Sequence, residues 1–307
     1  MDELVSAVIT ACNRDLNILE RAVKSVADQT YHNIEIIVVD DSSVKTPGRK
    51  EIEQYLTSNY DLTYIRHPKT LGACAARNTG LSRAKGYYIA YLDDDDEWLP
   101  RKIERQLTGF SNKEIALVYC NYIVDDEKNH ITYETKKKPP SPDLFISLLR
   151  FDLGMSTSVP LIRRDALEQI GGFDTSLQCW QDHDVWLRLA MQYKFALIPE
   201  SLMIYHSHLG SRISTNPLRK IEGTKRIIEK YQDEFSHDGA SWWNIHRLLV
   251  GFYMRNNQRK EALSLWFRIV GKCPYMVAGN LKKLGLILVG YDSSIYRFYK
   301  TTFTKRR

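Results

Sequence analysis

The stretch 4-LVSAVITACNRDLNILERAVKSVADQTYHNIEIIVVDDSS-43 decides the fold class of this chain. Residues 4–12 and 34–43 contain short, β-branched, apolar runs, as expected of strands buried on both faces of a parallel sheet. Residues 15–29 carry apolar side chains at helical spacing, and Asp15 stands at the N-cap position. Strand, helix and strand at this spacing predict a βαβ unit.

The same alternation continues toward the C-terminus. Residues 50–60 and 72–84 have the composition of helices, and 62–68, 87–93 and 115–124 that of strands. These elements predict an open α/β sheet flanked by helices, similar to a Rossmann fold. In such a sheet, ligands bind beyond the carboxyl ends of the strands.

The second half of the chain is less regular. Residues 131–143 and 153–164 are strand-like runs around a loop rich in Lys and Pro, so the sheet is expected to become mixed. Residues 179–192 follow the turn 171-GGFD-174 with apolar side chains on one helical face, and the chain beyond 217 is expected to be helical.

Acidic residues stand where two of the predicted strands end. They are Asp40 and Asp41 after the second strand and the run Asp93–Asp96 after 87-YYIAYL-92. Like charges this close repel one another, which indicates a positive partner. We therefore expect these acids to converge on one cleft, although a solvated acidic turn is the simpler alternative.

Three chemistries place carboxylates at such positions. A calcium loop of the EF-hand type is excluded, because its sixth position, counted from Asp93, is Trp98 instead of Gly. A phospho-accepting receiver module has an acidic pair similar to 36-IIVVDDSS-43, but a receiver begins with that strand. The third chemistry is a divalent cation held by Asp93 and Asp95 together with the phosphates of a nucleotide.

Composition narrows the setting in which this chemistry takes place. The 307 residues are 43% hydrophobic and 26% charged, as in a globular protein with a substantial core. The five cysteines are scattered without a CxxC pair, which favours a reducing compartment. The apolar run 284-LGLILVG-290 is far shorter than the roughly 20 residues of a spanning helix, so a cytoplasmic, soluble or peripheral protein is expected.

Charge is distributed unevenly along the chain. Residues 212–307 hold 19 Lys/Arg and 7 Asp/Glu, a net charge of +12, whereas residues 1–211 carry −6. Aromatic and basic residues alternate in this last third, as suits the headgroup region of an anionic membrane. A nucleic acid or a phosphate-bearing substrate would also match this charge, and a helical packing subdomain with a solvated basic face is the plainer alternative.

Six motifs in order resemble the inverting family 2 glycosyltransferases, which have the GT-A fold. They are 8-VITACNR-14, 36-IIVVDDSS-43, 71-LGACAARNTGL-81, 92-LDDDDEWLP-100, 171-GGFD-174 and 180-WQDHDVWLR-188. The resemblance covers about residues 1–215. It implies a GT-A catalytic domain over 1–215 and a basic, mostly helical region over 216–307.

The resemblance also implies roles for single residues. The nucleotide-sugar pocket would be formed by Ala11, Asn13, Asp40, Asp41, Arg77 and Asp94. Within it, Asp41 would accept a hydrogen bond from the uracil ring N–H, for which a carboxylate is chemically suited. Asp93 and Asp95 correspond to the metal-binding Asp-x-Asp motif, which would hold Mn²⁺ or Mg²⁺. His208 would be a further metal ligand, although a surface loop histidine is an equal alternative.

The catalytic base of the family corresponds to Asp182, and the acceptor site to Trp180 and Gln181. Trp180 could stack on an acceptor sugar. Asp182 could instead be only the N-cap of the helix that follows it. The family usually has Glu-Asp where this chain has Gln181-Asp182, which leaves the role of the first position open.

Together these observations predict a metal-dependent glycosyltransferase of the hexosyltransferase class. Its partners would be a UDP-sugar donor, a glycan or lipid-linked oligosaccharide acceptor and the inner face of the cytoplasmic membrane, reached through the basic C-terminal region, with no nucleic acid expected. The product would be a surface polysaccharide such as O-antigen or capsule. The alternative outside enzymology is the receiver-like signalling module.

Overall fold

The computed structural model describes residues 3–127, 129–207 and 216–272. Their contacts divide them into two units. The first unit comprises 3–148, 153–176 and 181–207, and the second comprises 149–152, 177–180 and 216–272.

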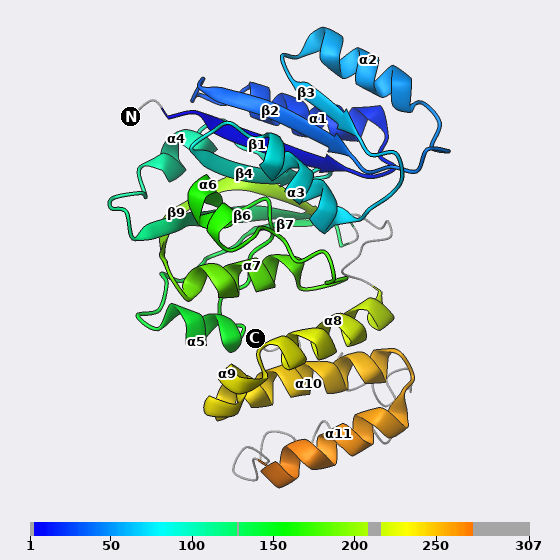
Figure 1. Cartoon of the computed structure of the whole chain (residues 1–307), viewed down its shortest axis with the longest axis vertical. Coiled ribbons are helices and arrows are strands. Elements are labelled where there is room, and N and C mark those ends of the chain that lie inside the picture. Colours follow the sequence, from blue (N-terminus) through cyan, green and yellow to red (C-terminus); the bar gives the residue numbers. More distant parts are fainter. Residues whose placement is uncertain (1–2, 128, 208–215, 273–307) are drawn as a thin grey trace. The chain divides into compact units, whose positions relative to one another are not determined.

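The first unit is built on a mixed sheet with the strand order β3-β2-β1-β4-β8-β6-β9-β5, and β7 pairs with β6 (Figure 1). The strands are β1 Val5–Ala11, β2 Ile34–Asp40, β3 Thr63–Arg66, β4 Tyr88–Asp93, β5 Glu97–Trp98, β6 Ile115–Asp126, β7 Ile131–Glu134, β8 Leu161–Arg163 and β9 Lys194–Ser207. The first four in this order are parallel, and β8 runs antiparallel to both β4 and β6. The mixed α/β sheet expected from the sequence is confirmed.

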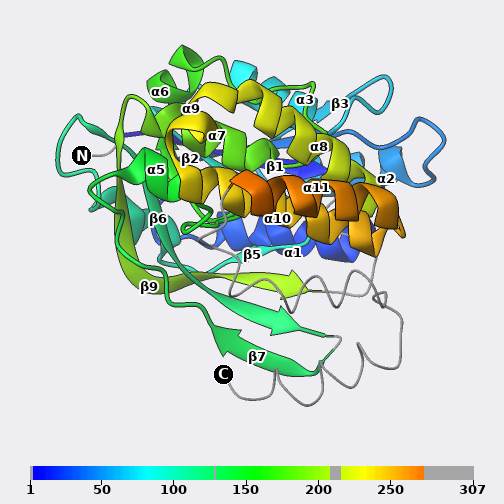
Figure 2. The ribbon, with the colours of Figure 1, turned by 90° about the horizontal axis from the view of Figure 1, so that it is seen from below.

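The helices of this unit connect the strands and cover the sheet. They are α1 Leu16–Ala27, α2 Arg49–Asn59, α3 Ala73–Arg83, α4 Lys102–Leu107, α5 Leu144–Leu149, α6 Arg164–Gln169 and α7 Gln181–Ala190. Right-handed crossovers place α1 and α2 on one face, while α3, which returns in the opposite direction to β4, lies on the other. Figure 2 shows α1 and α3 on opposite sides of the strands.

The core surrounds β1, in which only Thr10 is not fully buried. Small residues allow α3 to lie close to this strand. A Cβ atom at Gly80 would stand 2.2 Å from Cγ1 of Val8, so only glycine fits the observed spacing between α3 and β1. The small-residue composition of 72–84 therefore allows close packing of α3 against β1.

Most of the described part of the second unit is helical. Its helices are α8 Pro217–Lys230, α9 Gln232–His237, α10 Gly239–Arg255 and α11 Arg259–Lys272. The Asn216 side chain caps α8, and Asp238 caps α10 and also pairs with Arg150. None of the described helices is both long and apolar enough to span a bilayer. The division of the chain at residues 215 and 216 stays a prediction.

Candidate active site

The strand order reverses at β1, which has β2 on one side and β4 on the other. The parallel register places Ala11 beside Asp40 and Thr10 beside Asp93. The acids that follow β2 and β4 therefore lie at the carboxyl edge of the sheet, on either side of the end of β1. This is the topological switch point at which open α/β sheets bind ligands.

The acids at the end of β2 are buried and bonded internally. Asp40 is 2% exposed and pairs with Arg49, whose Nε lies 2.7 Å from Oδ2. Asp41 is 3% exposed and accepts hydrogen bonds from the His67 ring and from the backbone N–H groups of Leu71 and Gly72. Both carboxylates are thus fixed in place by groups of the protein itself.

The acids at the end of β4 pair with two arginines. The Asp93 carboxylate lies 2.8 Å from Nη2 of Arg77, and the Asp94 carboxylate lies 2.8 Å from Nη2 of Arg14. Asp94 also accepts the backbone N–H of Cys12 at 3.0 Å. Burial raises the pKa of Asp94 to about 6, although the Arg14 guanidinium opposes this shift.

The other two acids of the run differ from each other. Asp95 lies 3.4 Å from the same Arg14 nitrogen, and its backbone oxygen accepts from Arg21. Asp96 is 1% exposed and accepts the hydroxyl of Ser158 at 2.6 Å. Asp96 is therefore part of the interior, whereas Asp93 and Asp95 keep 31% and 16% of their side chains accessible.

The loop after β1 connects the two acidic groups. Asn13 has a left-handed backbone, with φ at 53°, a conformation that asparagine adopts more readily than most residues. Its N–H donates to the Ser42 hydroxyl at 2.7 Å, and its side-chain oxygen accepts the Ser43 N–H at 3.2 Å. Its neighbours Cys12 and Arg14 bond to Asp94 on the other side.

Gln181 and Asp182 begin α7, and they face the same arginine. The Gln181 side-chain oxygen accepts from Nη1 of Arg77 at 3.2 Å. Burial raises the pKa of Asp182, with Arg77 lowering it and Asp93 raising it further. Asp182 stands in the first turn of α7, and its carboxylate accepts the adjacent N–H of His183. It is not the residue that precedes the helix, as a simple N-cap would be.

The structure thus gathers most of the residues selected from the sequence at one edge of the first unit. They are Ala11, Asn13, Asp40, Asp41, Arg77, Asp93, Asp94, Asp95, Gln181 and Asp182. Trp180 belongs to the second unit, where its indole N–H donates to the Thr224 hydroxyl at 2.9 Å. His208 lies outside the described residues. The roles of all these residues stay predictions.

His206, two residues before His208, is in the described part. Its two ring nitrogens lie 3.4 Å from Glu97 and 3.3 Å from Asp125.

Four further residues of the site were not selected from the sequence: Arg14, His67, Thr157 and Ser158. Arg14 is the last residue of the motif 8-VITACNR-14, and His67 lies near the end of the predicted strand 62–68, so their positions in the sequence indicated that both could belong to the site. Thr157 bonds to Asp93 at 3.2 Å, and Ser158 donates to Asp96. These two lie in an irregular segment whose sequence has no periodicity that would place them beside the acids.

The acids Asp93–Asp96 at the carboxyl end of β4, called the β4 edge below, fit a divalent cation. Mg²⁺ and Mn²⁺ prefer hard oxygen ligands and are often held by only one or two carboxylates plus the phosphates of a substrate. Asp93 and Asp95 supply partly accessible carboxylates of this kind. Within the described ranges, no three His, Cys, Asp or Glu side chains are grouped as a metal site.

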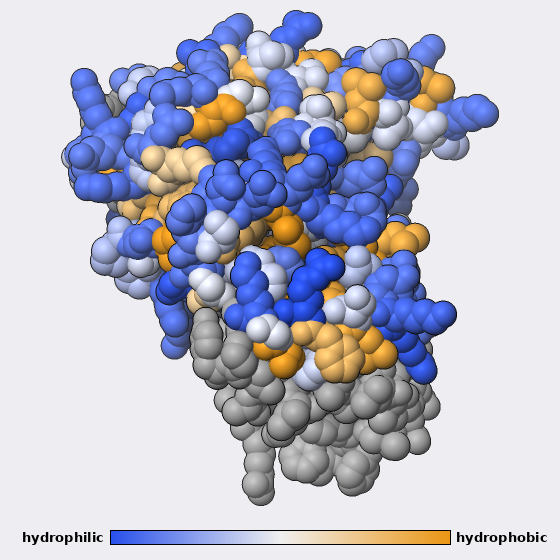
Figure 3. Space-filling view, turned by 60° about the horizontal axis from the view of Figure 1, so that its bottom comes forward, coloured by the Kyte–Doolittle hydropathy of each residue, from blue (hydrophilic) through white to orange (hydrophobic). Residues whose placement is uncertain are grey.

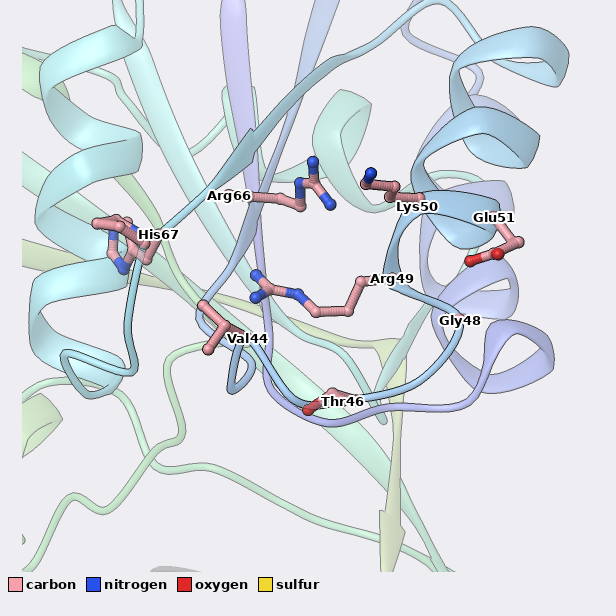
Figure 4. Close-up of a pocket in the computed structure, with 9 residues that line it drawn as sticks. Val44, Thr46, Gly48, Arg49, Lys50, Glu51, Arg66 and His67 are labelled. Carbon is pink, nitrogen blue, oxygen red and sulfur yellow. The ribbon is translucent and has the colours of Figure 1, made fainter.

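A pocket of about 450 Å³ opens beside Asp40 and Asp41 at the carboxyl end of β2, called the β2 edge below. Its lining includes Arg49 and Lys50 at the start of α2, Arg66 at the end of β3, and His67. In Figure 4 the charged ends of Arg49, Lys50 and Arg66 border the same open space. Arg49 is bound to Asp40 and Arg66 to Glu53, so much of this positive charge is already compensated.

Comparison with known proteins supports the resemblance seen in the sequence. The sequence profile of glycosyl transferase family 2 matches residues 6–171. A glycosyl transferase of Escherichia coli K12 whose name assigns it to colanic acid biosynthesis, WcaA, is 31% identical over 269 residues, which cover 83% of this chain and 89% of that protein. An uncharacterized glycosyltransferase of Rickettsia typhi is 34% identical over 306 residues and 92% of each chain.

Solved structures show the same fold. Staphylococcus aureus TarS in complex with UDP-GlcNAc has a TM-score of 0.59 and 14% identity, over 73% of this chain and 66% of that one. The mannosyltransferase PcManGT of Pyrobaculum calidifontis, in complex with GDP-Man and Mn²⁺, has a TM-score of 0.58 and 18% identity, over 97% of this chain and 83% of that one. The receiver-like alternative loses its basis, because its acidic strand lies within the matched range. The chain belongs to glycosyl transferase family 2 and is a glycosyltransferase with the GT-A fold.

Proposed function

We propose that this enzyme transfers a sugar from a UDP-sugar to a hydroxyl of a lipid-linked glycan, with inversion at the anomeric carbon, in the synthesis of a surface polysaccharide. The observation that carries the proposal is the convergence of Asp41, Arg77, Asp93, Asp95 and Asp182 at the switch point of the sheet. The pathway is inferred from the name of the Escherichia coli relative.

The β4 edge is suited to hold the diphosphate. Arg77 and Arg14 now pair with Asp93, Asp94 and Asp95. A bound diphosphate would offer the arginines a second anionic partner. The carboxylates that the arginines release could then bind a cation. A cation held by Asp93 and Asp95 would neutralise charge that grows on the leaving phosphate. The arginines contribute to the same end as donors of charge-assisted hydrogen bonds.

Asp182 is suited to act as the general base. Burial raises its pKa, which makes its carboxylate a better proton acceptor near neutral pH. It would take the proton from the acceptor hydroxyl, whose oxygen then forms the bond to the anomeric carbon while the bond to the diphosphate breaks. Because Arg77 interacts with Asp93, Gln181 and Asp182, one side chain connects the base to the leaving-group side.

A screen of nucleotide sugars tests the donor class. UDP-sugars are expected to bind the full chain more tightly with Mn²⁺ or Mg²⁺ than with EDTA, and calorimetry measures this difference directly. GDP-mannose serves as the competing donor, because PcManGT was solved with it. Binding of GDP-mannose in preference to every UDP-sugar would overturn the proposed donor. Equal affinity for UDP-sugars with the cation and with EDTA would overturn the proposed metal dependence.

We further propose that the basic C-terminal region docks on anionic lipid, where a lipid-linked acceptor is presented. The support is its net charge of +12 over residues 212–307. Figure 3 shows apolar side chains interspersed among hydrophilic ones on the coloured part of the face that it presents. In a sedimentation assay at low salt, the protein should be found in the pellet with anionic vesicles. Equal failure with anionic and neutral vesicles would reduce this region to a packing subdomain.

A further inference from the structure

Within the described residues, three donors reach the Asp41 carboxylate and leave it one accepting position. Oδ1 accepts from Nδ1 of His67 and from the N–H of Leu71, both at 2.7 Å. Oδ2 accepts from the N–H of Gly72 at 2.7 Å. A carboxylate has about four lone-pair positions, so one remains, on Oδ2. The group is 3% exposed, and the donors around it fix its orientation.

His67 is the only side chain among these three donors, and it is itself held from both sides. Its ring is buried, at 6% exposure, and Nε2 lies 2.9 Å from the Thr79 hydroxyl on α3. Its backbone N–H donates to the Asp40 carbonyl oxygen at 3.0 Å. Because a carboxylate oxygen can only accept, Nδ1 carries the proton in the bond to Asp41.

We propose that His67 is a positioning residue for recognition of the donor base. It holds the Asp41 carboxylate so that the remaining lone pair on Oδ2 meets a ring N–H of the base, such as the imide N–H of uracil. This inference rests on the proposed UDP-sugar donor. His67 contributes to specificity for the base without touching the ligand, because it acts through Asp41.

The geometry separates this role from a purely structural one. If His67 only closed the loop that leads to α3, its loss would weaken the fold and affect all ligands alike. If it orients Asp41, its loss would affect a base that donates a hydrogen bond more than a base that cannot. UDP and N3-methyl-UDP differ in this donor, since methylation removes the imide N–H.

Two substitutions at His67 separate its two ring nitrogens. In His67→Asn the side-chain amide nitrogen takes the place of Nδ1 and can still donate to Asp41. In His67→Gln the amide reaches the place of Nε2, near Thr79, and the donor to Asp41 is lost. A third variant, Thr79→Val, leaves the histidine but removes the hydroxyl that holds its ring.

The experiment measures dissociation constants of UDP and N3-methyl-UDP by calorimetry, with Mn²⁺ present. The wild type should prefer UDP by about 10-fold or more, the effect of one hydrogen bond to a charged group. His67→Asn should keep most of this preference, His67→Gln should reduce it to about twofold, and Thr79→Val should lie between them. In turnover assays, His67→Gln should raise the KM for the donor and leave kcat within about twofold.

The outcomes separate this inference from the proposed function. If the wild type binds no UDP, the donor proposal fails and this inference fails with it. If the wild type binds UDP but does not distinguish N3-methyl-UDP, Asp41 does not read the base and the inference alone is wrong. If His67→Gln and Thr79→Val both keep the wild-type preference, His67 does not position Asp41. Should His67→Gln not fold, the preference of Thr79→Val alone decides whether His67 positions Asp41.

Discussion

At the end of β2, Asp40 and Asp41 accept hydrogen bonds from Arg49, His67 and backbone N–H groups, and both are at most 3% exposed. At the end of β4, Asp93 and Asp95 pair with Arg77 and Arg14 and keep part of their side chains accessible. The two acidic edges lie on either side of the same strand. The carboxylates of the β2 edge are therefore fixed by donors of the protein itself. Those of the β4 edge pair with arginines that could equally bind phosphate.

This difference indicates a division of work between the edges. A carboxylate with fixed donors presents its remaining lone pair in one direction, which suits recognition of a base by shape and hydrogen bonding. A carboxylate held by a displaceable cation suits an exchange of ionic partners when a metal and a diphosphate arrive. Substitutions at the β2 edge should accordingly change stability most, and those at the β4 edge should change binding and turnover.

The largest effect is expected from Asp40→Asn. This change leaves the Arg49 guanidinium, which is 8% exposed, buried without an anionic partner. Breaking a buried pair in this way typically costs about 3–5 kcal/mol of unfolding free energy. Urea denaturation would measure it. The double variant Asp40→Asn/Arg49→Met should be more stable than Asp40→Asn alone, and a single variant within about 1 kcal/mol of the wild type would contradict the assignment.

Asp182→Asn tests the catalytic side of the comparison. It should leave the affinity for UDP unchanged and reduce turnover by about 10²-fold or more, because the acceptor hydroxyl loses its proton acceptor. Measuring donor binding and turnover on the same preparation controls for misfolding. Near-normal turnover would restrict Asp182 to its role in the first turn of α7 and place the base elsewhere.

Lys102 offers a further comparison, because its charge is buried without a carboxylate partner among the described residues. Its Nζ donates to Gln106 and lies 4.3 Å from the centre of the Trp98 ring, and within the described residues no carboxylate forms an ion pair with it. Burial lowers the pKa of Lys102 to about 8. Between pH 8 and about 10.5 the unfolded chain holds a proton that the folded protein has released, so the free energy of unfolding rises with pH there.

Lys102→Met should therefore remove this rise and stabilise the protein at pH 7. The shift in pKa corresponds to about 3 kcal/mol, and loss of the bond to Gln106 offsets about 1 kcal/mol of it. Denaturation curves at pH 7 and pH 10 for both proteins would measure the effect. A wild type whose stability falls between these two pH values, with Lys102→Met showing the same fall, would exclude Lys102 as a source of destabilisation.

The smallest effect is expected from Asp95→Ala. Because Asp95 is partly accessible and its ion pair is long, at 3.4 Å, its loss should cost less than about 1 kcal/mol of stability. Affinity for UDP in the presence of Mn²⁺ should fall by about 10-fold, with little change in EDTA. Asp61→Ala, at an exposed acid outside the Asp93–Asp96 run, controls for the change in net charge. Equal affinities of Asp95→Ala and the wild type with Mn²⁺ would remove Asp95 from the proposed metal site.

Much of this arrangement could be predicted from the sequence, for a physical reason. Strands β1, β2 and β4 are buried on both faces, so their apolar, β-branched runs stand out from the rest of the chain. The acids follow these strands directly and are therefore located together with them. Strand β8 has only three residues, and the contacts of Thr157 and Ser158 with Asp93 and Asp96 depend on tertiary packing. No local pattern encodes such contacts, and the same holds for the bond between His67 and Asp41.

The loop that links the two edges has a consequence for chemical reactivity. Cys12 is the exposed thiol of the described residues, whereas Cys74, Cys120 and Cys179 are buried. Partial burial of its sulfur, together with the nearby acids Asp41 and Asp94, raises the pKa of Cys12. Since the thiolate is the reactive form, this accessible cysteine should be alkylated slowly at neutral pH. The alkylation rate of Cys12 therefore depends on the burial of its sulfur and on the negative charge between the two acidic edges.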